Sequence, residues 1–124
     1  MVRIVLALYA LLFLVFGLRS LFDPQSILTL LSATDIGTDG IYELRGIYGG
    51  VSLGIAIMCG AAAFKPALQR PALYVLLAYM GGYVIARIAA ILTTGLPSPL
   101  FLAFSAFEAI SALIAAGLLW RRSR

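Results

Sequence analysis

The stretch Glu43–Gly54, which reads ELRGIYGGVSLG, opens the second apolar run of the chain. It places two opposite charges and four glycines at the start of a segment that is otherwise apolar as far as Phe64. Charges at the edge of a membrane helix need partners, and glycines let a neighbouring helix approach closely. Arg87 and Glu108 lie in equally apolar surroundings further along, and we expect them to be those partners.

The composition is typical of a membrane protein. Of the 124 residues, 63% are hydrophobic and 11% are charged, and the mean hydropathy is +1.07. A soluble domain of this size cannot bury so much apolar surface, because its surface-to-volume ratio is too high. We therefore predict one all-α integral membrane domain over residues 1–124. The net charge of +4 comes from basic residues at the ends of apolar runs, which indicates membrane topology rather than a nucleic-acid surface.

Residue types suited to metal or nucleophilic chemistry are scarce. The chain has no histidine and one cysteine, Cys59, which lies inside an apolar run. This excludes a disulfide framework, a zinc or haem ligand set, and a Ser/His or Cys/His catalytic pair. We expect no metal and no cofactor, and a non-enzymatic role is favoured over an enzyme. The sequence identifies no catalytic residue.

Four apolar runs are long enough to cross about 30 Å of hydrocarbon at about 1.5 Å per helical residue. They predict a membrane four-helix bundle with spans at about 4–22, 41–64, 72–92 and 100–120. The first run is longer than the apolar part of a signal peptide, and no small-residue cleavage site follows it, so we expect it to be retained.

Capping residues predict how the first connection begins and ends. Asp23 can cap a short helix over Pro24–Leu31, which is too short to span and is predicted to lie at the membrane surface. Asp39 is predicted as the N-cap of the second span.

Loop charges predict the orientation. Arg3, the 65–70 turn and the 121–124 tail are basic, whereas the 23–43 connection is acidic and the 93–99 turn is uncharged. The positive-inside rule then places both termini in the cytoplasm.

Helical phase assigns faces to the second span at about 100° per residue. One stripe, predicted to face lipid, consists of Leu44, Val51, Ile55 and Met58. The opposite side, predicted to face the bundle, carries Arg45, Gly46, Gly49, Ser52, Ala56 and Gly60. Gly46, Gly50 and Gly54 also repeat as small-xxx-small pairs, for which packing within the chain is favoured over a homodimer seam.

Depth places four charges in the same half of the bilayer. Counted from the outer ends of their helices, Arg45 and Arg87 lie roughly 6 Å deep and Glu108 roughly 12 Å deep, with Glu43 near the rim. An unpaired charge in a membrane helix costs on the order of 3 kcal/mol. We therefore predict a hydrogen-bonded Arg87–Glu108 pair with Arg45 and Glu43 nearby.

Two interpretations of this cluster stay open. It can serve only to fix the register of the helices, or it can hold a polar head or relay protons. Tyr83 lies one turn from Arg87, so its ring can stack on the guanidinium or its hydroxyl oxygen can accept a hydrogen bond from it. Tyr48 and Tyr83 can each serve in packing or as hydrogen-bond donors to a ligand, with packing favoured for each alone.

The combination of Glu43–Gly50 (ELRGIYGG), Arg87, Gly95–Pro99 (GLPSP) and Glu108 resembles a bacterial domain-of-unknown-function family. Its members are small four-helix membrane proteins that are similar in architecture to DoxX-like proteins. The resemblance covers most of the chain and implies a four-helix bundle in the bacterial inner membrane. It implies no activity, and no cofactor-binding DoxX pattern is visible.

Three functions are compatible with these features. The first is binding of an amphiphile, such as a lipid or quinone, beside Arg45, Arg87 and Glu108, or an accessory role in a membrane complex. The second is proton-coupled transport with Glu108 as the titrating carboxylate. The third is an intramembrane isomerase that uses Glu43 or Glu108. The partners compatible with this pattern are membrane lipid, an amphiphilic ligand, another membrane protein and a second copy of the chain. Nucleic acid is not expected.

Overall fold

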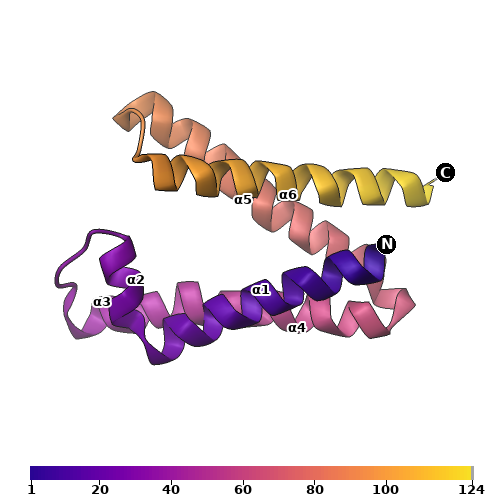
Figure 1. Cartoon of the computed structure of the whole chain (residues 1–124), viewed down its shortest axis with the longest axis horizontal. Helices are drawn as coiled ribbons and strands as arrows, with labels where there is room; N and C mark the ends of the chain where they lie inside the picture. The colour runs from indigo at the N-terminus through magenta and orange to yellow at the C-terminus, as the bar shows by residue number, and fades with distance from the viewer. Residues whose placement is uncertain (124) are drawn as a thin grey trace. The chain divides into compact units, whose positions relative to one another are not determined.

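The computed structural model describes residues 1–123, and every regular element among them is a helix (Figure 1). Four segments are long and apolar enough to cross a membrane: Val2–Phe22, Gly37–Phe64, Pro66–Thr94 and Pro99–Arg121. The predicted all-α fold with four membrane-spanning helices is confirmed. Each predicted span lies within one of these segments. Arg124, the last residue of the predicted basic tail, lies outside the described residues.

The chain divides into two compact units, of which the first is Met1–Gln69 and the second begins at Arg70. Helices α1 (Val2–Phe22) and α4 (Val51–Phe64) pack along each other in the first unit. The buried residues of α1 recur every three or four positions and so form one stripe: Leu6, Tyr9, Phe13, Gly17 and Ser20. The prediction that the whole chain forms one domain stays a prediction.

Both ends of the α1–α4 pair are held by specific contacts. At the start of α1, Arg3 Nε donates a 2.8 Å hydrogen bond to the carbonyl oxygen of Ala63, in the last turn of α4. Towards the other end, a Cβ at Gly17 would lie 3.1 Å from the carbonyl oxygen of Gly49, and a Cβ at Gly49 would lie 2.8 Å from Cγ of Leu21. Glycines at both positions therefore permit a close helix crossing.

A short helix, α2 (Pro24–Leu30), follows α1 directly. As predicted, Asp23 caps it, since its Oδ1 accepts a hydrogen bond from the Ser26 backbone N–H at 3.3 Å. Arg19 Nε donates to Ser26 Oγ at 2.9 Å, which ties the last turn of α1 to the first turn of α2.

The second span begins with α3 (Gly37–Leu44), four residues before the predicted start. The prediction of Asp39 as N-cap was wrong, because Ile36 occupies the cap position and Asp39 lies in the first turn. Asp35 Oδ1 instead accepts the backbone N–H of Gly37 at 2.9 Å. Gly37 has φ +64°, which glycine adopts without strain, so the helix can start ahead of Asp39.

A π-helical segment, η1 (Arg45–Gly50), joins α3 to α4 and changes which side chains face inward. In an α-helix, Leu44 and Gly49 would be about 140° apart around the axis. Hydrogen bonds between residues five apart bring these two positions towards one face. Leu44 is consequently buried in a cluster with Ile27 and Leu28. The prediction that Leu44 faces lipid was wrong, because it assumed α-helical phase throughout.

The buried face of α4 is wider than predicted. Gly49, Ser52 and Ala56 are buried as predicted. Ile55, which was assigned to the lipid-facing stripe, is also buried. Small residues along this face let α1 lie close to α4. At this short distance α1 also covers Ile55.

The second unit is a hairpin of α5 (Gln69–Thr94), apart from its first residue, and α6 (Pro99–Ser123), joined by a four-residue turn (Figure 1). After α4, Lys65 is extended and a short 3₁₀ turn, η2 (Pro66–Leu68), leads into α5. The helix starts earlier than predicted because proline is tolerated in a first turn, where Pro71 lies. Gly95 ends α5 with φ +95°, and its N–H donates to the Ile91 carbonyl oxygen at 3.0 Å.

Candidate functional site

A partly buried ion pair joins α5 to α6. Arg87 Nε donates to Glu108 Oε2 at 3.1 Å, and a terminal guanidinium nitrogen donates to Oε1 at 3.0 Å. Both carboxylate oxygens are thus engaged in the planar, two-pronged geometry that guanidinium and carboxylate prefer. The side chain of Glu108 is 10% exposed and that of Arg87 is 36% exposed. The predicted hydrogen-bonded pair is confirmed.

The turn between the helices explains why these residues meet. Arg87 lies seven residues before the end of α5, and Glu108 lies nine residues after the start of α6. At 1.5 Å per residue these positions are about 10 Å and about 14 Å from the turn. Both helices extend beyond the predicted spans, which brings the two depths closer together than the sequence suggested.

Tyr83 covers the guanidinium from within α5, and Tyr79 in turn contacts Tyr83. The Arg87 Cζ atom lies 5.4 Å from the centroid of the Tyr83 ring, so the predicted stacking is confirmed. The Tyr83 ring meets that of Tyr79 edge-on at 5.1 Å, and their hydroxyl oxygens are 3.3 Å apart. This arrangement restricts the rotamers open to Arg87.

A cavity of about 250 Å³ lies beside Arg87, between the end of α5, the turn and the start of α6. Most of its lining is apolar, and the polar side chains in it are Arg87, Thr94 and Ser105. Ser105 Oγ donates to the Phe101 carbonyl oxygen at 2.9 Å, which leaves its oxygen lone pairs as acceptors. The turn residues that line the cavity are uncharged and follow no helical period, so they could not be assigned to the site from the sequence.

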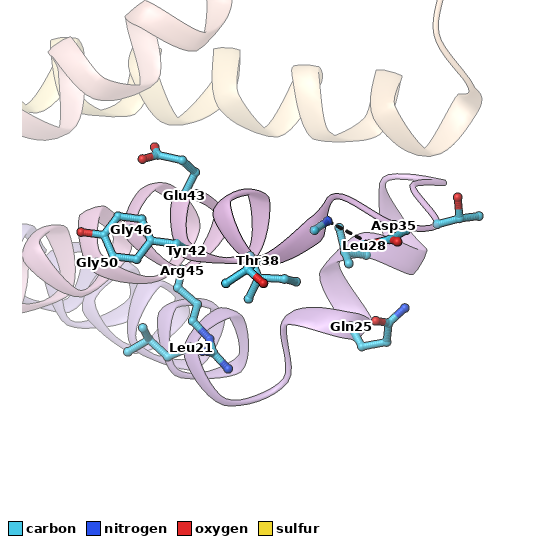
Figure 2. Close-up of a pocket in the computed structure, with 13 residues that line it drawn as sticks. Leu21, Gln25, Leu28, Asp35, Thr38, Tyr42, Glu43, Arg45, Gly46 and Gly50 are labelled. Carbon is cyan, nitrogen blue, oxygen red and sulfur yellow. Dashed lines mark hydrogen bonds between the residues drawn. The ribbon is translucent and has the colours of Figure 1, made fainter.

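Glu43 and Arg45 belong to the first unit and are both exposed there. Figure 2 shows their side chains projecting from opposite sides of the helix. Among the side chains that the structure describes, those of residues 1–121, neither has a hydrogen-bond or ion-pair partner. Within the first unit, the π-helical segment gives the packed face to Leu44 and leaves Arg45 exposed. A cluster of these residues with Arg87 and Glu108 would join the two units, and it stays a prediction.

Both residues line a groove of about 960 Å³ at one end of the first unit (Figure 2). The groove is formed by the end of α1, α2, the following loop, α3 and the start of η1. Its lining includes the apolar side chains of Leu21, Leu28 and Ile41. It is thus a second polar region, built from other elements than the Arg87 cavity.

The remaining predicted site residues lie in the first unit. Tyr48 is half-buried, and its ring meets that of Phe16 edge-on at 6.2 Å, which is a packing contact. A Cβ at Gly46 or Gly54 would meet no atom within 4 Å, and one at Gly50 would meet only the Arg45 carbonyl oxygen, at 3.9 Å. A packing role for these three glycines stays a prediction. Gly17, the partner of Gly49, was not predicted, because it stands alone in the first run.

Across the part of the chain that the structure describes, no three metal-ligating side chains gather.

Comparison with known proteins identifies one family. The model of a family described as a domain of unknown function (DUF4345) matches residues 1–119. No curated protein and no solved structure matches the chain.

Proposed function

This chain belongs to the DUF4345 family, and we propose that it binds the uncharged polar head of a lipid- or quinone-like amphiphile beside Arg87 and Glu108. The observation that carries this proposal is the cavity of about 250 Å³, which combines one ion-paired guanidinium and two hydroxyl groups with apolar walls. Small-molecule sites typically have this composition, with a few polar groups that orient the ligand.

Charge favours an uncharged head. Glu108 already compensates Arg87, so the two formal charges cancel and the site has no excess positive charge to attract an anion. An anionic head would have to compete with Glu108 for the same guanidinium. A carbonyl or ester oxygen needs only a hydrogen-bond donor or polar surroundings. The site provides both while Arg87 and Glu108 stay paired.

Size favours an amphiphile. Pockets that enclose a whole drug-sized ligand are usually about 300–1,000 Å³, and this cavity is smaller. It fits a ring or head group, and the rest of the ligand would lie along apolar helix surface. Leu92 and Leu96 beside the turn are 80% and 76% exposed and supply such a surface.

The test is native mass spectrometry of protein extracted gently from its membrane. We expect an uncharged amphiphile to be retained by the wild type and lost, by about tenfold or more, from the double variant Arg87→Met/Glu108→Leu. That variant removes both charges together, which is tolerated far better than removing one. Arg70→Gln, outside the cavity, is the matched control. Recovery of wild-type protein without any such ligand would overturn the proposal.

Proton-coupled transport through Glu108 is the weaker alternative. A titrating carboxylate needs access to water on each side in turn, whereas both Glu108 oxygens are held by Arg87 and the side chain is buried. Flux into proteoliposomes that disappears in Glu108→Gln would favour transport over simple binding.

We further propose that the protein lies in the bacterial inner membrane with both termini in the cytoplasm. The hydrogen bond from Arg3 to Ala63 supports this, because it puts the basic start of α1 and Lys65 at the same end of the first unit. Labelling of single cysteines introduced at Ser98 and at Lys65 with an impermeant reagent tests the orientation. Ser98 is expected to react in intact cells after outer-membrane permeabilisation, and Lys65 only after lysis.

A further inference from the structure

The hydroxyl groups that line the cavity beside Arg87 already donate their protons to other groups of the protein. Ser105 has one hydroxyl proton, and it donates this proton to the Phe101 carbonyl oxygen at 2.9 Å. To donate to a ligand instead, Ser105 would have to give up that hydrogen bond. Towards the cavity Ser105 is therefore a hydrogen-bond acceptor.

Thr94 presents its hydroxyl oxygen in the same way. Its neighbour Thr93 donates its single hydroxyl proton to the Ala89 carbonyl oxygen at 2.8 Å, with the Ala90 carbonyl oxygen at 3.3 Å. The proton in the 3.4 Å contact between the two threonine hydroxyls consequently comes from Thr94. This contact is long for a hydrogen bond between hydroxyls, so Thr94 is a less firmly fixed acceptor than Ser105.

The end of α5 adds backbone acceptors to the same cavity. The last four carbonyl groups of an α-helix have no partner within the helix. Of these four in α5, the Ile91 carbonyl oxygen accepts the Gly95 N–H at 3.0 Å. Thr94 is the last residue of the helix, and it lines the cavity. A helix C-terminus also carries partial negative charge, which favours a donor over an anion.

Arg87 supplies hydrogen-bond donors to this cavity. A guanidinium has five N–H groups, and the ion pair with Glu108 uses two of them. A ligand that suits both Arg87 and Ser105 must therefore accept and donate, and a hydroxyl group does both. A carbonyl, ester or ether oxygen only accepts, and it would bury the Ser105 oxygen without a donor, which is unfavourable in an apolar cavity.

Building on the proposed binding of an amphiphile, we infer that this cavity selects an uncharged head that carries a hydroxyl group. The hydroxyl would donate to Ser105 or to the acceptors at the end of α5, while its oxygen accepts from Arg87. Two kinds of amphiphile offer this chemistry, namely lipids with a free glycerol hydroxyl and lipids with a phenolic hydroxyl.

Binding of matched probes to the full-length protein tests this selection, in nanodiscs of phosphatidylcholine, which carries no hydroxyl group. Monooleoylglycerol is compared with its dimethyl ether, and decylhydroquinone with its dimethyl ether. We expect the wild type to bind at least one hydroxyl probe about five- to tenfold more tightly than its ether. A preference within the first pair alone would assign a glycerol head, and one within the second pair alone a phenolic head.

Variants at Ser105 connect this preference to the cavity. Ser105→Ala should weaken binding of the hydroxyl probe about fivefold and leave the affinity for the ether unchanged. Ser105→Thr keeps the hydroxyl and should keep the preference. Ser111→Ala is the matched control, because Ser111 Oγ makes the same kind of hydrogen bond, to the Phe107 carbonyl oxygen at 2.7 Å, outside the cavity. Circular dichroism and retained ether binding show that each variant is folded.

Equal affinity of the wild type for a hydroxyl probe and its ether, in both pairs, would overturn the inference. If those probes were also lost together from Arg87→Met/Glu108→Leu, the proposed amphiphile site would stand without the hydroxyl selection. A preference that Ser105→Ala leaves intact would likewise contradict the inference. Failure of all four probes to bind the wild type would count against the proposed function and the hydroxyl selection together.

Discussion

The two units of this protein differ in whether their charged side chains are paired. In the second unit Arg87 and Glu108 come from two helices, lie well inside the spans and satisfy each other through two hydrogen bonds. In the first unit Glu43 and Arg45 lie six and eight residues after the start of one span at Gly37, point apart and stay exposed. Distance from the helix end does not explain the difference, because Arg87 lies only seven residues before the end of α5. What differs is that a neighbouring helix, α6, supplies Arg87 with a carboxylate.

The two units also differ in what brings their helices together. The first is held by close backbone packing, in which Gly17 and Gly49 allow α1 to approach η1. In the second, an ion pair links α5 and α6. Charge substitutions should therefore affect mainly the second unit, and glycine substitutions mainly the first.

The largest effect is expected when one member of the ion pair is removed. Glu108→Leu leaves the partly buried Arg87 without its counter-charge and should lower the free energy of unfolding by about 3 kcal/mol. Unfolding in a mixed-micelle denaturant titration measures this. Adding Arg87→Met should recover most of the loss, and a double variant as unstable as the single one would contradict the pairing argument.

Alanine at the close helix crossing is expected to have the next largest effect. Gly17→Ala places a methyl group 3.0 Å from Leu53 Cγ and 3.1 Å from the Gly49 carbonyl oxygen, so the helices must move apart. The expected cost is about 1–3 kcal/mol in the same titration. Gly54→Ala, with open space at its Cβ, is the control and should be neutral or stabilising by up to about 1 kcal/mol. Equal effects at both positions would show that the crossing is not tight.

Deletion of one residue tests the π-helical segment. Removal of the exposed Ile47 would let an α-helix bring Leu44 and Gly49 to within about 40° of each other, so both stay buried. The expected loss of stability is within about 1 kcal/mol. Deletion of Ile57 in α4, which is also exposed, rotates one half of that helix by about 100° and should be far more damaging. A larger loss for Ile47 than for Ile57 would argue against the segment as a one-residue insertion.

The smallest effect is expected from Arg45→Gln. Because Arg45 is exposed and has no partner among the described residues, its loss should change the free energy of unfolding by no more than about 0.5 kcal/mol. Arg87→Gln, measured in parallel, should cost several times more. A large effect at Arg45 would indicate that it pairs across the two units, as the sequence had suggested.

Much of the fold was predictable because membrane spans are set by local composition. Runs of about 20 apolar residues have few alternatives in lipid, so the four helices follow from hydropathy. The Arg87–Glu108 pair was also predictable, since a short turn makes the two helices antiparallel neighbours and fixes the levels of their residues. Both predictions needed only helix geometry and the cost of an unpaired charge.

The helical phase of the second span was not predictable in the same way. A helical wheel assumes one angle per residue, and η1 breaks that assumption between Leu44 and Gly49. The start of α3 depended on the left-handed Gly37 and on Asp35 as its acceptor, although Asp39 was an equally good cap by composition. These choices depend on which face α1 and α2 cover.

The sequence by itself determined that this is a four-span helical membrane protein and that Arg87 must find Glu108, because lipid makes apolar length and buried charge decisive. Only the tertiary structure decided that Leu44 faces inward, that Arg45 faces out over a groove, and that Gly17 meets Gly49. Those outcomes depend on how α1 and α2 pack against the second span. There the π-helical segment shifts the side chains around the helix axis by one residue, which a sequence pattern that assumes a regular α-helix does not show. Only the first part of the stretch Glu43–Gly54, as far as Gly50, contributes to the wall of a surface groove in the first unit.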